Sequence, residues 1–510
     1  MAGKLERIVK EIFQNNVIWS LIAVFMNAAI NFAIVPFITG HIGVDAYGFV
    51  SLGNTMISYI DVISLALNTF ASRYIAMYYL RRDMKEAKAY YSSLTMANIG
   101  LCVIMLALSV PFIFCLDHLI RIPEALTGDV KALFFFLLLR YFAVMMRTTL
   151  EVSAFIRNRL DLTSKIRVLS LLVQAAALVL LYGLLRPMIW YTGFSFFLAA
   201  LFVLIGEYLL KKKLTPKLVM RREEFSFGIV KTLMRLGVWH SLTYAGNVLN
   251  TGLDLFITNR MLSGTDMGYV SVAKTLGSMC IATHTAVREA MKPLQLKAYS
   301  EDDIPQTVEQ LKKSMRYSSF VSVLILAGFV AVGRHFLQLW TPGEDITVLY
   351  RLSVIVLLGE SVVASVSPLY YTYILAKKVV LPCVLTFITG FGNVLSMYLL
   401  IHYTGMGVYA VVLTTLVVDL LHYLDAPLYA AYCLKVKWTT FYPAVGQHVL
   451  ASLCMSVTMA LIGCVLPGTG GWGALIVKCL VLGAVGAAEY FLIFDRRDLA
   501  SLKERFTGRP

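Results

Sequence analysis

Residues 239–278 read WHSLTYAGNVLNTGLDLFITNRMLSGTDMGYVSVAKTLGS and repeat residues 19–58, which read WSLIAVFMNAAINFAIVPFITGHIGVDAYGFVSLGNTMIS. When the two are aligned without a gap at an offset of 220 residues, seven of the forty positions are identical. The identical pairs are Trp19/Trp239, Asn27/Asn247, Gly48/Gly268, Val50/Val270, Ser51/Ser271, Thr55/Thr275 and Ser58/Ser278. Each copy reads as an apolar helix, a short polar turn and a second apolar helix. Because self-similarity at a fixed spacing sets the architecture of a chain, we expect two related lobes whose paired helices line the space between them.

The composition is that of a membrane protein. Of the 510 residues, 58% are hydrophobic and 15% are charged, and the mean hydropathy is +0.73, whereas soluble proteins average about a quarter charged residues. Fourteen apolar runs are long enough to cross a hydrocarbon core about 30 Å thick. They lie near 16–38, 48–70, 93–116, 131–153, 167–186, 189–210, 236–258, 268–288, 317–338, 351–375, 380–402, 407–430, 445–466 and 473–494. We therefore predict an all-α polytopic membrane protein with about 14 transmembrane helices.

The spacing of the repeat predicts how the lobes are arranged. Six predicted spans separate the two copies, and an even number inserts both copies the same way up, so the repeat is parallel about an axis along the membrane normal. This predicts two parallel six-helix lobes around a central cavity, at 1–210 and 236–432, joined by a cytoplasmic linker at 211–235. Residues 433–510 add two spans without a counterpart in the first lobe, followed by a basic cytoplasmic tail.

The basic residues predict the orientation in the membrane. With the N-terminus in the cytoplasm, about 35 of the 45 Lys and Arg lie on the cytoplasmic side and about six on the other, which satisfies the positive-inside rule. The main clusters lie at 81–88, 211–222 and 496–509. Both termini are therefore expected in the cytoplasm. Cytoplasmic loops beside anionic membrane lipids explain the net charge of +15, so no nucleic-acid partner is predicted.

Several classes of protein are disfavoured. The eight cysteines lie in or beside apolar spans without paired CxxC spacing, which predicts no metal site. No GxxxxGK[ST] loop is present, so ATP is not expected to be the direct fuel. The predicted loops reach only about 15 residues outside and about 30 in the cytoplasm, which leaves no room for a folded catalytic domain. A transporter without a cofactor is favoured over an enzyme, and coupling to Na⁺ or H⁺ stays open.

Polar residues recur on single faces of the repeated helices, as judged at 100° per residue. The first and second spans carry asparagines on such faces, and the seventh span carries asparagines and an aspartate. Hydrogen bonds between helices explain any one of these residues, whereas the repeated set favours a hydrated central cavity. The predicted lining residues are Asn27, Asn31, Asn54, Asn247, Asn250 and Asp254.

Charged residues within the spans are costly unless they are paired or solvated, so they indicate functional positions. Arg140 and Arg147 stand seven residues apart on one face of the fourth span, and Lys274 lies on the eighth. We predict that these three cations line the cavity and bind the substrate. The alternative for Arg147 is an ion pair with Glu151, four residues further on, that only fixes helix packing.

Two further groups of titratable residues are candidates for other roles. Intramembrane carboxylates and an imidazole can exchange an ion or a proton, and the candidates are Asp61, Glu360, Asp419, His422 and Asp425. A basic group near the cytoplasmic end of the eighth span is a candidate for the place where an anionic headgroup enters, although snorkelling of long basic side chains explains it equally well. This group consists of His284, Arg288 and Lys292.

Buried cations in a hydrated cleft suit an anionic cargo, and phosphate is the commonest such group. A lipid that carries a sugar chain on a diphosphate fits, because its head can cross through the cavity while its tail stays in the lipid. With about two negative charges, outward movement gains roughly 2 × 2.3 kcal/mol per 100 mV of inside-negative potential. Such a lipid-linked oligosaccharide is the predicted partner.

Three stretches carry a resemblance to a known family. They are Asn16-Val-Ile-Trp19, Ile42-Gly-Val-Asp-Ala-Tyr-Gly-Phe49 and 239–269, which contains Asp254-Leu-Phe-Ile-Thr-Asn259. They resemble the bacterial polysaccharide flippases, which export O-antigen, capsule and exopolysaccharide units and belong to the multidrug/oligosaccharidyl-lipid/polysaccharide exporter superfamily. Fourteen spans is also the count of the lipid II flippases of this superfamily, whereas its drug exporters usually have twelve.

The resemblance implies a V-shaped cavity between two six-helix lobes and transport by alternating access. It implies transfer of undecaprenyl-diphosphate-linked sugars from the inner to the outer leaflet of the bacterial cytoplasmic membrane, with polysaccharide assembly proteins as candidate partners. Cationic cavity residues are typical of the lipid flippases, and by their placement Arg140, Arg147 and Lys274 are the residues here that would have this role.

Two other functions stay open. One is a cation-coupled multidrug exporter of the same fold, in which Asp61, Asp254 or Glu360 would bind a cationic drug. The other is a membrane glycan polymerase or ligase, which would change the length of a glycan rather than its leaflet.

Overall fold

The computed structural model describes residues 16–466 and 470–491, and within these ranges the chain forms helices and no strands. Fourteen helices are 18 residues or longer, which confirms the predicted all-α polytopic fold. They are α2 (Asn16–His41), α3 (Val44–Asn68), α5 (Met84–Phe114), α7 (Thr127–Ile156), α8 (Leu160–Leu184), α9 (Trp190–Leu214), α10 (Phe227–Thr251), α12 (Gly264–Ser300), α13 (Ile304–Trp340), α14 (Ile346–Val366), α16 (Val380–Tyr403), α17 (Val408–Leu434), α18 (Tyr442–Val465) and α19 (Trp472–Glu489). Short helices α4 (Ala71–Leu80), α6 (Leu116–Leu119), α11 (Asp254–Met261) and α15 (Tyr370–Leu375) connect them. The predicted basic tail at 496–509 lies outside the described residues.

Most of these helices are suited to a membrane. Among the described residues, 11 helical segments are long and apolar enough to cross a bilayer. The long helices outside this set are α7, α10 and α12, and they carry Arg140, Asn247 and Lys274 respectively. Each of these three less apolar helices thus carries a candidate cavity residue, whereas Asn27, Asn31 and Asn54 lie on α2 and α3, within the apolar set.

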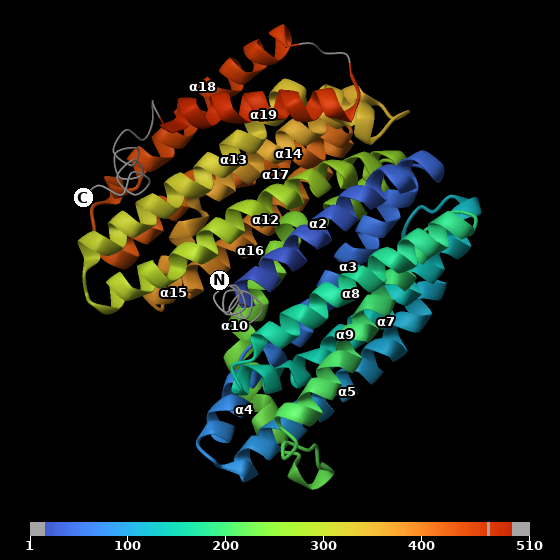
Figure 1. Cartoon of the computed structure of the whole chain (residues 1–510), viewed down its shortest axis with the longest axis vertical. Coiled ribbons are helices and arrows are strands. Elements are labelled where there is room, and N and C mark those ends of the chain that lie inside the picture. The colour runs from blue at the N-terminus through green and yellow to red at the C-terminus, as the bar shows by residue number, and fades with distance from the viewer. Residues whose placement is uncertain (1–15, 467–469, 492–510) are drawn as a thin grey trace, which may run out of the picture. The chain divides into compact units, whose positions relative to one another are not determined.

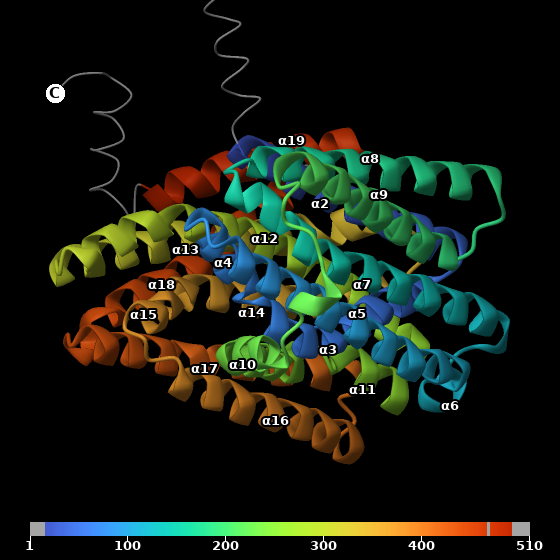
Figure 2. The ribbon, with the colours of Figure 1, turned by 90° about the horizontal axis from the view of Figure 1, so that it is seen from below.

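The chain divides into two compact units. Unit 1 runs through Gly268 and includes Thr386–Val394, and unit 2 comprises Tyr269–Leu385 and the chain from Leu395 onward. In unit 1, α9 packs between α7 and α8, α2 packs on α8, and α10 packs on α3; Figures 1 and 2 both show α8 beside α9. In unit 2, α13 contacts α14, α18 and α19, and α14 contacts α17. The predicted lobe boundary at 211–235 rests on the sequence repeat and stays a prediction.

Glycines allow the closest helix contacts in unit 1. Gly48 on α3 and Gly268 on α12, which are equivalent positions of the repeat, lie against each other: a Cβ on Gly48 would stand 3.1 Å from the Gly268 Cα. Further along α3, a Cβ on Gly237 of α10 would overlap the carbonyl oxygen of Ala66. Small residues let helix backbones approach closely in membrane proteins, so these glycines determine how α10 and the start of α12 sit on α3.

One predicted span is interrupted. The sequence indicates a continuous helix over 236–258, but α10 ends at Thr251 and α11 begins at Asp254. Gly252 stands at the break, where a Cβ would come within 2.6 Å of the Val248 carbonyl oxygen, and the Tyr59 hydroxyl donates a hydrogen bond to the Gly252 oxygen at 2.5 Å. Glycine disfavours a helix interior, and this tertiary hydrogen bond stabilises the break.

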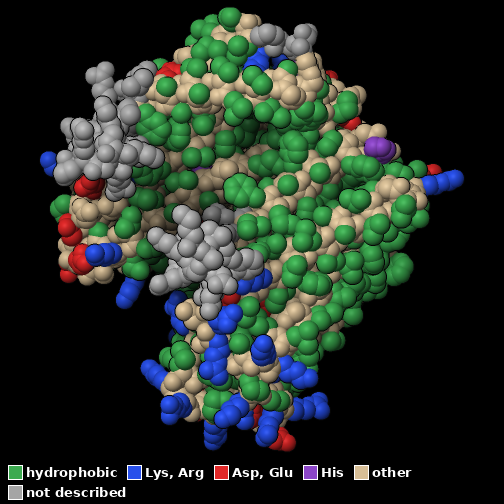
Figure 3. Space-filling model, in the orientation of Figure 1, with side chains coloured by type: hydrophobic (Ala, Val, Ile, Leu, Met, Phe, Trp, Pro, Cys, Tyr) green, Lys and Arg blue, Asp and Glu red, His purple; other side chains and the backbone are tan. Residues whose placement is uncertain are grey.

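Basic side chains gather at one end of unit 1. Figure 3 shows Lys and Arg over the end that carries α4 and the connection after α9. The exposed residues there include Arg81, Arg82, Lys85, Lys212, Lys213, Arg221 and Arg222. This distribution agrees with the predicted cytoplasmic position of these loops.

Candidate functional site

A polar cavity of about 510 Å³ lies within unit 1, among α2, α3, α7, α8 and α9. Its volume falls in the range of small-molecule binding sites, roughly 300–1,000 Å³. The polar residues that line it are Ser20, Asn27, Asn31, Asn54, Arg140, Arg147, Arg167, Ser170 and Gln174. The cavity thus combines three guanidinium groups with four side-chain amides, and none of the described residues that line it is acidic.

Helical periodicity brings these side chains to one place. Arg140 and Arg147 are seven residues apart on α7, and Arg167 and Gln174 are seven apart on α8. Seven residues make almost two full turns, so each pair lies along one face of its helix. The packing of α9 against both α7 and α8 turns these two faces toward the same space.

Arg140 is held in a defined position. Its Nη1 donates a hydrogen bond to the Asn54 Oδ1 at 2.7 Å, and its guanidinium carbon lies 5.1 Å from the centre of the Phe196 ring. Neither the ring nor the neutral amide neutralises the positive charge, and the carboxyl group of Asp61 lies within electrostatic range of it. Arg140 therefore presents a fixed cation to the cavity.

Arg147 has unused hydrogen-bonding capacity. Its Nη2 lies 3.7 Å from the Glu151 Oε2, which is a long ion pair, and its buried Nε has no hydrogen-bond partner. The alternative predicted for Arg147 and Glu151 is thus present in part, because the pair forms while Arg147 still lines the cavity. A buried donor without a partner is unfavourable by about 1–3 kcal/mol. An anion that binds at Arg147 would supply the missing acceptor for its Nε.

A buried carboxylate stands behind the arginines. Glu207 on α9 is fully buried, and the side chain of Thr163 on α8 lies beside its carboxyl group. This carboxyl group lies within electrostatic range of Arg147 and Arg167. Glu207 thus places a carboxyl group near two cavity arginines without lining the cavity itself.

Sequence reasoning missed Arg167, Gln174 and Glu207. Arg167 is the first residue of the predicted fifth span, a position where a basic side chain is ordinarily interfacial. The seven-residue spacing of Arg167 and Gln174 is a signal that could have identified them, because it matches that of Arg140 and Arg147.

Asp61 lies in a second, smaller cavity of unit 1. This cavity has a volume of about 350 Å³ and is lined in part by Ser64, Asn68, Tyr141 and Tyr244. Asp61 is also within electrostatic range of Arg140. The second cavity is therefore acidic where the first is basic.

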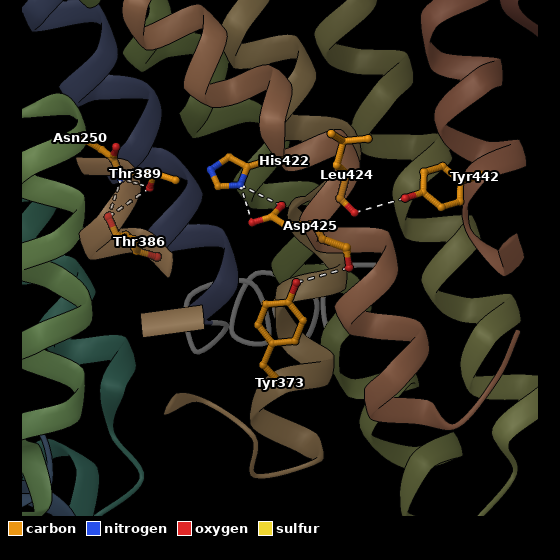
Figure 4. A network of polar contacts seen from close by, with 9 residues as sticks. Asn250, Tyr373, Thr386, Thr389, His422, Leu424, Asp425 and Tyr442 are labelled. Atoms are coloured by element: carbon orange, nitrogen blue, oxygen red, sulfur yellow. Dashed lines mark hydrogen bonds and ion pairs between the residues drawn. The ribbon is translucent and has the colours of Figure 1, made fainter. Parts of the chain in front are cut away.

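The remaining residues predicted to line the cavity have other environments. The Asn250 amide donates to the Thr386 carbonyl oxygen at 3.2 Å and to the Thr389 Oγ1 at 3.3 Å, both on α16 (Figure 4). Asn250 thus has the helix-joining role that was the alternative for it. Asn247 is exposed, and Asp254 is buried in the first turn of α11. None of the three lines the polar cavity.

Unit 2 holds a separate group of charges. Lys274 lies on α12, Glu360 on α14 and Asp419 on α17, and Glu360 is within electrostatic range of both others. The helices are close here, since a Cβ on Gly359 would stand 2.5 Å from the Asp419 Oδ2. In the described ranges, no group of three or more His, Cys, Asp or Glu is arranged to hold a metal ion.

His422 and Asp425 form an ion pair one turn apart on α17, with the His422 Nδ1 3.2 Å from the Asp425 Oδ1. Figure 4 shows the two side chains pointing toward each other. The ring of Tyr370 lies edge-on to the imidazole at 6.0 Å. The structure therefore joins two of the candidate coupling residues directly.

The predicted basic group of the eighth span is partly neutralised. His284 is buried, at 2% exposure. Arg288 and Lys292 both approach Glu289, at 3.6 Å and 2.6 Å, and the Lys292 Nζ lies 5.4 Å from the centre of the Tyr371 ring. Of the three, the two long basic side chains are partly exposed and the histidine is not.

Comparisons with known proteins place this geometry in context. No protein-family model matches the chain. The membrane protein EpsK of Bacillus subtilis (strain 168), itself uncharacterized, is 25% identical over 402 residues, which cover 79% of this chain and 78% of EpsK.

Solved structures of a flippase and of a drug transporter are among those that share the fold. The lipid II flippase MurJ in an inward closed conformation matches with a TM-score of 0.66 and 14% identity, covering 95% of this chain and 100% of MurJ. An outward-facing multidrug resistance transporter of the MATE family matches with a TM-score of 0.62 and 14% identity, covering 82% of this chain and 94% of the transporter. Both are transport proteins rather than enzymes. The chain is therefore a multi-pass membrane protein with the fold of the MurJ flippase and of the MATE-family transporter.

Proposed function

We propose that the protein moves a polyprenyl-diphosphate-linked oligosaccharide from the inner to the outer leaflet of the bacterial cytoplasmic membrane, for assembly of a surface polysaccharide. The observation that carries this proposal is the cavity lined by Arg140, Arg147 and Arg167, in which none of the described lining residues is acidic. Guanidinium groups form strong, often paired hydrogen bonds with phosphate oxygens, and the amides of the cavity suit sugar hydroxyls.

The expected energetics support outward transport of an anion. A cargo with about two negative charges gains roughly 2 × 2.3 kcal/mol per 100 mV when it leaves a cell with an inside-negative potential. In this proposal, the lobes at 1–210 and 236–432 open the cavity alternately to the two sides of the membrane. Lys274 adds a cation from the second lobe. The two spans within 433–510 lie outside the repeat. Ion or proton coupling would use Asp61, Glu360, Asp419, His422 or Asp425, and polysaccharide assembly proteins would receive the cargo.

The test is transport by the purified protein in liposomes, with a fluorescent polyprenyl-diphosphate N-acetylglucosamine as the probe. We expect Arg147→Ala to slow its transfer about 10- to 100-fold, because a hydrogen bond to a charged group contributes about 1.5–3 kcal/mol. Arg140→Ala and Lys274→Ala should also slow it. The matched control is Arg186→Ala, which removes an exposed arginine outside the cavity.

The same variants distinguish a lipid-linked oligosaccharide flippase from a cation-coupled multidrug exporter. If the protein is instead a multidrug exporter that binds cationic drugs, the wild-type protein would not transfer the glycan probe. The Arg147→Ala variant would then still export drugs. Transfer of the probe at the rate of protein-free liposomes, or an equal rate for Arg147→Ala and wild type, would refute the flippase proposal. A change in glycan length would indicate a polymerase or ligase.

A further inference from the structure

A groove of about 660 Å³ lies on unit 2, beside the beginning of α16 and the end of α17. It is lined by Lys378, Val380, Leu381, Val384, Tyr429 and Tyr432. The three aliphatic side chains are exposed to 51%, 48% and 45%, in that order. In a membrane protein such side chains face lipid, so the groove has an apolar wall within the bilayer and a cation at one end.

The cation is held in place. The Lys378 Nζ lies 3.9 Å from the centre of the Tyr432 ring, which is a close cation–π contact. The Tyr429 hydroxyl donates a hydrogen bond to the Lys378 carbonyl oxygen at 3.1 Å, and the Lys378 amide donates to the Tyr373 carbonyl oxygen at 2.8 Å. The two hydrogen bonds fix the backbone at Lys378, and the ring contact positions its ammonium group. The ring contact leaves the N–H donors of the ammonium available to a phosphate.

The surrounding sequence is basic and lacks acidic residues. Lys377 and Lys378 precede α16, and Lys435 and Lys437 follow α17, whereas 371–384 and 426–441 contain no Asp or Glu. Trp438, in the same connection, is 65% exposed. Exposed tryptophan and tyrosine beside lysines are typical of the headgroup level of a membrane. The positive-inside pattern assigns these connections to the cytoplasmic leaflet, which holds the anionic lipids.

We propose that this groove binds one acidic phospholipid of the cytoplasmic leaflet. Its headgroup phosphate contacts Lys378 with support from the neighbouring lysines, and one acyl chain lies along Val380, Leu381 and Val384. Basic pockets between transmembrane helices are known to select such headgroups. The groove shares no lining residue with the arginine cavity, so this inference does not depend on the proposed transport function.

The first test is native mass spectrometry of the delipidated full-length protein, titrated with phosphatidylglycerol or phosphatidylcholine. We expect one phosphatidylglycerol to bind before any other lipid. Lys378→Glu should weaken that binding about tenfold or more, since it replaces the positive charge at the headgroup with a negative one. The matched control is Lys297→Glu, an exposed lysine of unit 2 that does not line the groove. Equal weakening by both variants would overturn the proposal in favour of a diffuse basic surface.

A second pair of measurements tests the apolar wall. Val384→Trp fills the groove and keeps every lysine. Because Val384 is exposed, the variant is expected to fold. Size-exclusion chromatography checks this expectation. It should lower phosphatidylglycerol occupancy about as much as Lys378→Glu does. Soluble glycerol 3-phosphate should not displace the lipid at millimolar concentration. Unchanged binding by Val384→Trp, or displacement by glycerol 3-phosphate, would show that the groove does not hold an acyl chain.

Discussion

Arg140 and Arg147 illustrate how two similar residues on one helix face acquire different roles. Arg140 is positioned by Asn54 and the Phe196 ring, which fix its geometry and leave its charge exposed to the cavity. Arg147 has a long contact with Glu151 and a buried Nε without a partner. An incoming anion can therefore improve the hydrogen bonding of Arg147 more than that of Arg140, so we expect the loss of Arg147 to slow transport more.

Glu207 provides the next prediction at this scale. Glu207→Gln replaces a buried carboxyl group within electrostatic range of Arg147 and Arg167 by an amide that cannot carry a negative charge. We expect inorganic diphosphate to bind about tenfold more tightly, because a nearby unit charge changes the interaction by on the order of 1–2 kcal/mol in a partly polar site. Isothermal titration calorimetry of the purified protein measures this affinity. Glu309→Gln, at an exposed position of unit 2, is the control; weaker or unchanged binding by Glu207→Gln would contradict the prediction.

At the scale of elements, the helices of unit 1 depend on glycine where they cross. Gly237 brings α10 against the Ala66 carbonyl of α3, and Gly268 brings the start of α12 against the backbone of Val44. A backbone carbonyl cannot move aside as a flexible side chain can. These contacts therefore fix the path of α10, whose last turn ends at the break beside Gly252.

A substitution on α10 tests this packing. Gly237→Ala should lower the unfolding temperature of the protein in detergent by several degrees, because an extra methyl group in a packed interface costs about 1–3 kcal/mol. Gly228→Ala, on the same helix, is the control, since only the Ser226 Oγ lies near its Cβ position, at 3.5 Å. That control should leave the unfolding temperature unchanged or raise it slightly, as alanine favours a helix over glycine. Equal stability of the two variants would mean that α10 does not depend on a close approach at Gly237.

At the scale of the whole molecule, the distribution of charge predicts which end faces the cytoplasm. The exposed basic residues of unit 1 gather at the end that carries α4 and the α9–α10 connection (Figure 3). Moving such residues across a bilayer is unfavourable, and they are retained on the cytoplasmic side during insertion. The proposed direction of transport and the proposed phospholipid site both require this orientation.

Cysteine labelling tests the orientation. In a variant whose eight native cysteines are replaced, we introduce Thr404→Cys or Lys437→Cys, both at exposed positions between helices. A membrane-impermeant maleimide should label Thr404→Cys on intact cells, and it should reach Lys437→Cys only after the membrane is permeabilised. The reverse pattern would place the N-terminus outside and reverse the expected direction of transport.

The sequence by itself determined the class of fold and much of the distribution of polar groups. A hydrocarbon core about 30 Å thick requires about 20 apolar residues per span, and this signal is local, so the helices could be counted and placed. The helical period is local as well, which is why Arg140 and Arg147 could be assigned to one face. Asn27, Asn31 and Asn54 line the same cavity as these arginines.

The tertiary structure alone decided which neighbours each polar residue meets. Asn250 was predicted to line the cavity but bonds to α16, and the span expected over 236–258 breaks where Tyr59 hydrogen-bonds to Gly252. Glu207 acquired its relation to two cavity arginines only through the packing of α9 against α7 and α8. Such relations depend on contacts between residues far apart in the chain, and helix periodicity contains no information about which faces will meet.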